Sequence, residues 1–189
     1  MQQLKIFKTH PDIVLPKYGT AEAACFDLAY QPAGKTTFKG YTMRNSSFEK
    51  EIETDGLIVV YPGERVLIPT GLIFDIPKGW SVRVHPRSGL ALKNGIILSN
   101  CEGVIDSDYF HETMVMTWNT SERYFMINPG DRIAQAEVVP VNQVEFVETT
   151  VQPTQRTDRV GGHGSTGVSE TVAKHWPDLS NWKPERVVT

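Results

Sequence analysis

Short apolar runs separated by turn residues fill most of the sequence and leave little room for helices. Between residues 56 and 141, runs rich in Val, Ile, Leu and Phe alternate with breaks such as Pro62-Gly63 and Pro77-Lys78-Gly79. Such breaks favour tight turns, and short β-branched runs favour strands. Many short strands without a helical period predict an all-β, jelly-roll-like antiparallel sandwich or barrel. Strands are expected at residues 4–7, 23–30, 57–61, 65–68, 71–76, 80–84, 95–100, 103–106, 113–119, 123–128, 132–141 and 144–148.

Two neighbouring strand pairs are expected to form hairpins. Residues 95–100 pair with 103–106 across a polar bend, and residues 113–119 pair with 123–128. A single helical turn is expected between the strand at residues 80–84 and the strand at residues 95–100. Ser88 would be its N-cap, and Gly95 would end it.

The length of 189 residues suits one domain with extensions. We expect a β domain over residues 1–150 and an extended C-terminal arm over residues 151–189. Residues 31–55 are polar and predict a surface insertion, with its own hairpin around residues 38–43.

Composition excludes several classes of protein. With 40% hydrophobic and 22% charged residues, the chain has the make-up of a soluble globular protein. The net charge of -3 argues against broad nucleic-acid binding, which needs a basic face, but permits a free nucleotide as ligand. The sequence offers no signal-like N-terminus, no bilayer-spanning run and no zinc-type spacing of Cys or His, so we expect no membrane and a cytoplasmic location.

Residues 86–112 contain the side chains most suited to nucleotide chemistry. Arg87 beside a helix start offers a fork of donors and unpaired N–H groups, which predicts a phosphate seat. An ordinary capped turn with a surface arginine is the alternative. Asn100 can read the edge of a nucleobase, Asp106 can take a proton from water, and Tyr109 offers a flat face for a sugar. A polar turn with solvated aspartates is the alternative here, and we prefer it for Asp108.

Five stretches in order resemble the sequence motifs of the homotrimeric dUTP pyrophosphatases (dUTPases). The first is Ala24-Cys25-Phe26-Asp27-Leu28, and the second and third lie within residues 86–112. The fourth is residues 130–135, Gly-Asp-Arg-Ile-Ala-Gln, and the fifth is the glycine-rich stretch 161–167. The resemblance covers most of the chain and implies the jelly-roll fold of this family.

The resemblance implies hydrolysis of dUTP to dUMP and pyrophosphate with Mg²⁺, in a homotrimer whose subunits share active sites. This reaction supplies dUMP for thymidylate synthesis and keeps uracil out of DNA. Asp106 would activate the water that attacks the α-phosphate, and Asp27 would hold Mg²⁺ through water. A buried aspartate paired with a backbone group or an arginine is the alternative for Asp27. The substrate-binding residues would be Arg87, Ser88, Gly89, Asn100, Gly103, Val104, Ile105, Tyr109, Met114, Gln135, Arg159, His163, Gly164, Ser165 and Thr166.

Several positions depart from the family pattern or allow another role. Cys25 stands where glycine is usual, Phe110-His111 replace Arg-Gly, and His163 replaces a stacking phenylalanine. Arg159 lies one residue nearer the glycine pair than is common. Gln135 could bind a phosphate or a neighbouring backbone group.

Two other functions compete with dUTP hydrolysis. A dCTP deaminase shares the fold but needs a glutamate where Met116 stands, which disfavours deamination. An idle dUTP-binding or regulatory module would not need Asp27, Asp106 and Tyr109 together.

Overall fold

Strands account for nearly all regular structure in the computed structural model, which describes residues 3–158. They form one compact unit through Val144, and the residues from Glu145 form a separate unit. The elements are β1 (Lys5–Lys8), β2 (Phe26–Ala29), β3 (Thr37–Tyr41), β4 (Ser47–Glu51), β5 (Ile58–Val60), β6 (Arg65–Pro69), β7 (Leu72–Asp75), β8 (Trp80–His85), α1 (Ser88–Asn94), β9 (Ile96–Leu98), β10 (Gly103–Ile105), β11 (Met114–Asn119), β12 (Phe125–Ile127) and β13 (Arg132–Pro140).

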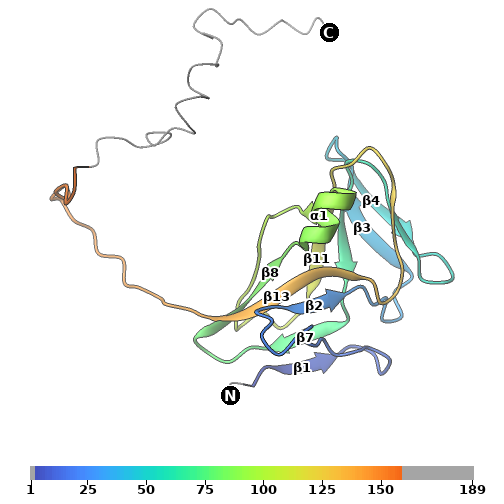
Figure 1. The fold of residues 1–189 in the computed structure, drawn as a ribbon, viewed down its shortest axis with the longest axis horizontal. Helices are drawn as coiled ribbons and strands as arrows, with labels where there is room; N and C mark the ends of the chain where they lie inside the picture. The colour runs from blue at the N-terminus through green and yellow to red at the C-terminus, as the bar shows by residue number, and fades with distance from the viewer. Residues whose placement is uncertain (1–2, 159–189) are drawn as a thin grey trace, which may run out of the picture. The chain divides into compact units, whose positions relative to one another are not determined.

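The strands form two main antiparallel sheets. One has the order β10-β8-β13-β2, and the other has the order β4-β3-β6-β11-β9. Two smaller pairs, β1-β7 and β12-β5, complete the domain (Figure 1). The predicted all-β jelly-roll class, with one short helix, is confirmed.

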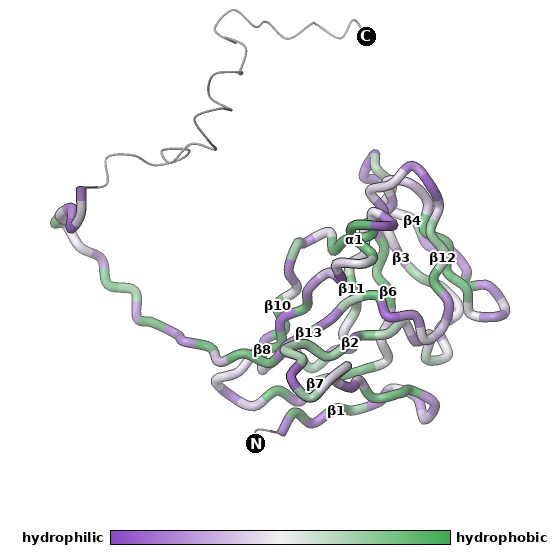
Figure 2. Tube along the Cα trace, in the orientation of Figure 1, coloured by the Kyte–Doolittle hydropathy of each residue, from purple (hydrophilic) through white to green (hydrophobic). Residues whose placement is uncertain are grey.

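The core follows from the two-residue period of the strands. In β6, Val66 and Ile68 are buried while Leu67 between them is exposed, as expected for side chains that alternate across a pleated strand. Figure 2 shows β6 and β12 as apolar stretches of the trace. Burying such side chains stabilises the fold by about 1.5–3 kcal/mol each. No helix within residues 3–158 is long and apolar enough to span a bilayer.

Both predicted hairpins are wrong. β9 pairs with β11 and β10 pairs with β8, so the bend after Leu98 carries the chain from one sheet to the other. Likewise β12 pairs with β5, whereas β11 pairs with β6 and β9. Ile96, Leu98 and Ile105 all enter the core. A hairpin would have left both strands in one sheet, whereas the crossing lets both main sheets contribute apolar side chains to the same interior.

The strand predicted at residues 144–148 is absent from the described residues. Val144, Phe146 and Val147 are 68–94% exposed, and the segment pairs with no other part of residues 3–158. A strand needs a hydrogen-bonding neighbour, and apolar alternation by itself does not supply one.

The polar segment 31–55 supplies two strands to the second sheet. β3 and β4 pair along their length, and β3 joins β6 through Gly40↔Val66 and Tyr41↔Arg65. Phe38 is buried in the core. The hairpin therefore forms one edge of the five-stranded sheet, at the right of Figure 1.

Candidate active site

The helix that follows β8 positions Arg87 at its start. Arg87, not Ser88, is the N-cap, with an extended backbone and no side-chain cap bond, and Ser88 is the first helical residue. The predicted N-cap is therefore wrong by one residue. The guanidinium of Arg87 is bound instead to Asp27. The predicted end is confirmed, since Gly95 adopts a left-handed conformation (φ 67°) and its N–H donates to Ala91 and Leu90.

Asp27 lies between two arginines from different elements. Arg87 Nε is 2.9 Å from Asp27 Oδ1, and Arg132 Nη1 is 3.0 Å from Asp27 Oδ2. β2 and β13 are neighbouring strands, which brings residues more than one hundred positions apart into contact. Asp27 is therefore paired with arginines, which the sequence left open as an alternative to holding Mg²⁺. Two guanidiniums against one carboxylate leave a surplus positive charge beside the helix.

Gln135 also lies at this position, opposite Asp27 in the β2-β13 register. Its side-chain Nε2 donates to the carbonyl of Pro86 at 3.0 Å, which is the backbone role that the sequence left open. The bond ties β13 to the turn before α1 and keeps the amide beside Arg87.

Asp27, Arg87 and Gln135 line a hollow of about 480 Å³. Its polar lining, which includes the cations of Arg87 and Lys93, suits an anionic ligand, and the first N–H groups of a helix have no intrahelical partner. Burial raises the pKa of the Cys25 thiol, and the charges of Glu137 and Asp27 raise it further, so Cys25 stays a neutral wall residue. The lining residues are Gly19, Thr20, Ala23, Cys25, Asp27, Arg87, Ser88, Gly89, Leu90, Lys93, Asn94 and Gln135.

A second hollow, of about 190 Å³, lies where the bend crosses between the sheets. The bend is held by N–H groups of Cys101 and Glu102, which donate to Leu98 O (3.1 Å) and Asn100 O (2.6 Å). Six of the predicted base- and sugar-binding residues line this hollow together, with apolar neighbours that suit a flat ring. The lining residues are Val84, Leu98, Asn100, Gly103, Val104, Ile105, Tyr109, Thr113, Met114, Val115 and Met116.

Asp106 comes directly after Ile105, which lines the second hollow. Asp106 itself is exposed and lines a third hollow, of about 750 Å³. Asp108 and Phe110 line the same hollow. The Tyr109 N–H donates to Asp106 O at 3.1 Å, which closes a turn between the two residues. Within one chain, the predicted site residues therefore lie in three separate hollows. Arg159, His163, Gly164, Ser165 and Thr166 lie outside the described residues.

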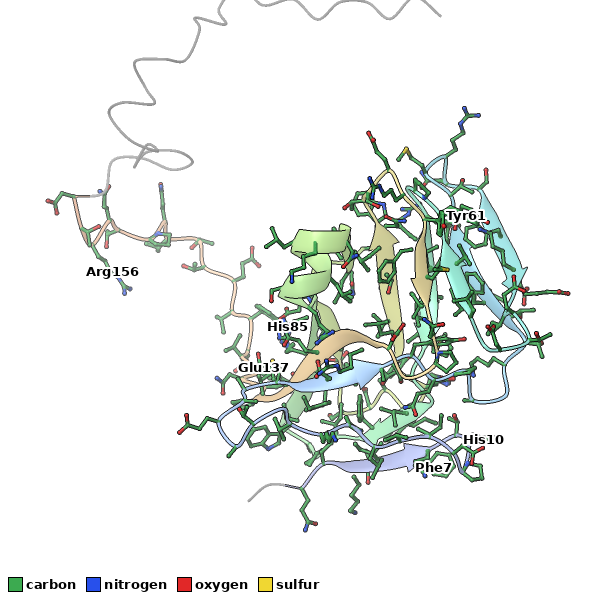
Figure 3. The ribbon with its side chains drawn as sticks, turned by 45° about the vertical axis from the view of Figure 1, so that its right-hand side comes forward. Phe7, His10, Tyr61, His85, Glu137 and Arg156 are labelled. Carbon is green, nitrogen blue, oxygen red and sulfur yellow. The ribbon has the colours of Figure 1, made fainter. Side chains whose placement is uncertain are left out.

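A charged cluster that joins β8, β13 and the bend after Leu98 was not predicted. His85 Nε2 is 3.2 Å from Glu137 Oε1 (Figure 3), and Arg83 Nη1 is 3.3 Å from Glu102 Oε2. The cluster holds the bend at Glu102 against β8 and β13. Arg132 is exposed, and its pairing with Asp27 depends on strand register, which spacing in the sequence does not show.

Comparisons with known proteins identify the family. Residues 52–167 match the dUTPase family model. The chain is also 42% identical over 166 residues to the deoxyuridine 5'-triphosphate nucleotidohydrolase of Nautilia profundicola, covering 87% of this chain and 99% of that protein. The chain belongs to the dUTPase family. The resemblance carried by the five motifs is thereby confirmed.

Solved dUTPase structures share the fold. A variant of the Staphylococcus bacteriophage 80alpha dUTPase with dUpNHpp has a TM-score of 0.69 at 18% identity, covering 89% of this chain and 100% of that chain. A variant dUTPase from phage phi11 of S. aureus, described with a structural Mg(II) ion, has a TM-score of 0.61 at 18% identity, covering 79% and 98%. At such identities these structures support the dUTPase fold, and the roles of individual residues rest on the site itself.

Proposed function

We propose that this dUTPase-family chain hydrolyses dUTP to dUMP and pyrophosphate, with Asp106 activating the water that attacks the α-phosphate. The observation that carries this proposal is the position of Asp106. Its carboxylate is exposed directly after Ile105, the last residue of the strand that walls the base hollow. An accessible carboxylate next to the proposed base hollow suits a general base.

Base and sugar selection would come from the second hollow. The side-chain amide of Asn100 and the backbone around Gly103 can pair with the edge of uracil, and the closeness of Gly103 to Val84 keeps this part narrow. A Cβ at Gly103 would lie 3.1 Å from Val84 Cβ, so a side chain here would crowd the hollow, and the narrow bend would exclude a 5-methyl group. Tyr109 would lie against the deoxyribose and reject a 2′-hydroxyl.

The triphosphate would lie in the polar hollow. Arg87 and the N–H groups of Ser88 and Gly89 would bind phosphate oxygens, with the amide of Gln135 beside them. Arg159, Ser165 and Thr166 of the arm would bind the γ-phosphate, and His163 would stack on the base. In displacement reactions at phosphorus, most of the catalysis comes from positioning the substrate and neutralising its charge.

The carboxylates near the polar hollow suit a Mg²⁺ ion that is held mainly by the phosphates of the substrate. Among residues 3–158, no group of three or more His, Cys, Asp or Glu could hold a metal ion, and Asp27 is already bound by two arginines. Mg²⁺ usually keeps several waters and takes one or two carboxylates plus phosphates. Asp27 would therefore hold it through water. When bound, the ion supplies charge neutralisation on the phosphate oxygens.

A homotrimer with shared active sites is proposed with this function. The division of the site residues among separate hollows of one chain supports it, since a neighbouring subunit can bring the hollows together. Cys25 and Cys101 are free thiols, which supports a reducing compartment such as the cytoplasm.

Asp106→Asn tests the role of the carboxylate. The amide keeps the shape but cannot take a proton, so turnover should fall by roughly 10²–10⁴-fold, while affinity for dUpNHpp stays close to that of the wild type. Pyrophosphate release and calorimetric binding measure the two quantities. A near-normal rate would refute the assignment of Asp106.

The same samples separate the alternatives. Met116 lines the base hollow with a thioether and offers no carboxyl group for deamination, so dCTP should release no ammonia. An idle binding module would bind dUpNHpp but release no pyrophosphate from dUTP.

A further inference from the structure

The loop of residues 106–112 carries the proposed base and the sugar-facing tyrosine, yet most of it is exposed. Its exposed residues are Asp106, Asp108, Tyr109, Phe110 and His111, and the half-buried ones are Ser107 and Glu112. Catalytic groups must be held within about 0.5 Å of their productive positions by packing and hydrogen bonds around them. The loop therefore needs an anchor.

Glu112 is that anchor. Its side chain is 15% exposed, and both carboxylate oxygens are bound by other elements. Oε1 accepts the Gly71 N–H at 2.8 Å, and Oε2 lies 2.6 Å from Lys35 Nζ. Of the side chains in this loop, within residues 3–158, Glu112 is the one that binds outside the loop.

The Gly71 side of the anchor is rigid. Gly71 has φ +68°, and a Cβ there would lie 2.4 Å from Ile13 Cδ1, so the position requires glycine. The same turn binds the residue after Glu112 twice more. Thr70 Oγ1 donates to Thr113 O at 2.6 Å, and the Thr113 N–H donates to Leu72 O at 2.8 Å.

The Lys35 side comes from segment 31–55. Lys35 closes a tight turn, in which its N–H donates to Pro32 O at 2.9 Å. None of the residues that we place in the site belongs to segment 31–55. Because its side chain is 35% exposed and Glu112 is 15% exposed, the ion pair is screened less than a surface pair.

We propose that Lys35 and Glu112 are positioning residues, and that their ion pair holds the 106–112 loop so that Asp106 and Tyr109 keep their places when nucleotide binds. The inference rests on the proposed function, since it assigns to segment 31–55 a part in the turnover and sugar selectivity of that same site. Breaking the pair should let the loop shift, and a shift of about 1 Å can cost up to 10²-fold in rate.

The chain contains a matched control pair. Lys50, also from segment 31–55, lies 2.5 Å from Glu64, whose other oxygen accepts the Tyr61 N–H at 3.0 Å. The side chains are 32% and 10% exposed, close to the values for Lys35 and Glu112. Lys50 also lies over the rings of Phe48 and Tyr61. The pair has the same chemistry but binds the β5–β6 turn instead of the catalytic loop.

The experiment compares Lys35→Met with Lys50→Met in the full-length chain. Methionine keeps the apolar stem of lysine and removes the charge. Lys35→Met should lower kcat/KM for dUTP about tenfold, mainly through kcat, and narrow the preference for dUTP over UTP by a similar factor. Lys50→Met should leave both within about twofold while lowering the melting temperature at least as much. Lys35→Arg should restore most of the lost rate and preference.

Two outcomes would overturn the inference. One is a Lys35→Met enzyme with wild-type kcat/KM and sugar preference. The other is an equal kinetic loss in Lys50→Met, which would make the effect one of general stability. Failure of the proposed function is distinguishable, because the wild type itself would then release no pyrophosphate from dUTP.

Discussion

At the scale of single residues, Asp27 shows how charge balance prepares the anion site. Its carboxylate oxygens lie 2.9 Å from Arg87 Nε and 3.0 Å from Arg132 Nη1, so contacts within the chain orient both guanidiniums. Pre-ordered charged groups lose less conformational freedom when the ligand binds. The same carboxylate can therefore orient the arginines and remain available to a hydrated ion.

Tyr30 predicts a stability change with pH. Its side chain is fully buried and its hydroxyl donates to Gly56 O at 2.7 Å, and burial raises the pKa of Tyr30 from 10.0 to about 12. The native state thus favours the protonated phenol. The stabilisation is complete below about pH 10 and is lost as pH rises towards 12.

Tyr30→Phe should remove this pH dependence. Near neutral pH the variant should be less stable by about 1–3 kcal/mol, because Gly56 O loses a donor. Between about pH 10 and 12 the gap to the wild type should shrink. Urea unfolding at several pH values measures both, and a gap that stays constant would contradict the raised pKa.

At the scale of elements, the turn after β11 depends on one buried amide. Asn119 is fully buried, and its Nδ2 donates to Val60 O (2.9 Å) and Arg123 O (2.7 Å). Its Oδ1 accepts from the N–H and hydroxyl of Ser121. This side chain therefore joins β11 to β5 and directs the chain into β12.

Asn119→Ala should lower the free energy of unfolding by about 2–4 kcal/mol, because the carbonyls of Val60 and Arg123 each lose a donor and a cavity is left at a buried position. Asn142→Ala, at an exposed position after β13, should change it by less than about 0.5 kcal/mol. Denaturant titration with equal m-values checks this, and a small effect at residue 119 would mean that water replaces the amide.

At the scale of the whole molecule, the separate hollows of one chain predict complementation between subunits. Asp106→Asn and Arg87→Ala should each be nearly inactive by themselves. If one subunit supplies Asp106 and its neighbour supplies Arg87, mixed trimers should regain up to about a third of wild-type activity, because one of the three interfaces in each mixed trimer has both intact residues.

The measurement co-expresses the two variants with different tags and assays the doubly purified complex. A trimer has three times the mass of the 21.2 kDa chain, which light scattering reports. Mixed complexes without recovered activity would mean that each site is built within one subunit.

The sequence by itself determined the fold class and the family. Alternation along runs such as Arg132 to Pro140 predicted strands, because burial on one face imposes a two-residue period that is visible locally. The order of the five motifs predicted the family, and the residues assigned to base and phosphate do gather in two hollows.

Only the tertiary structure decided which strands are neighbours. β9 and β10 follow each other in sequence but enter different sheets, and Asp27 meets Arg132 through the pairing of β2 with β13. The contact between Lys35 and Glu112 arises in the same way. Strand pairing depends on hydrogen bonds and packing between segments far apart in the chain, and a local pattern fixes which face is buried but not which partner lies beside it.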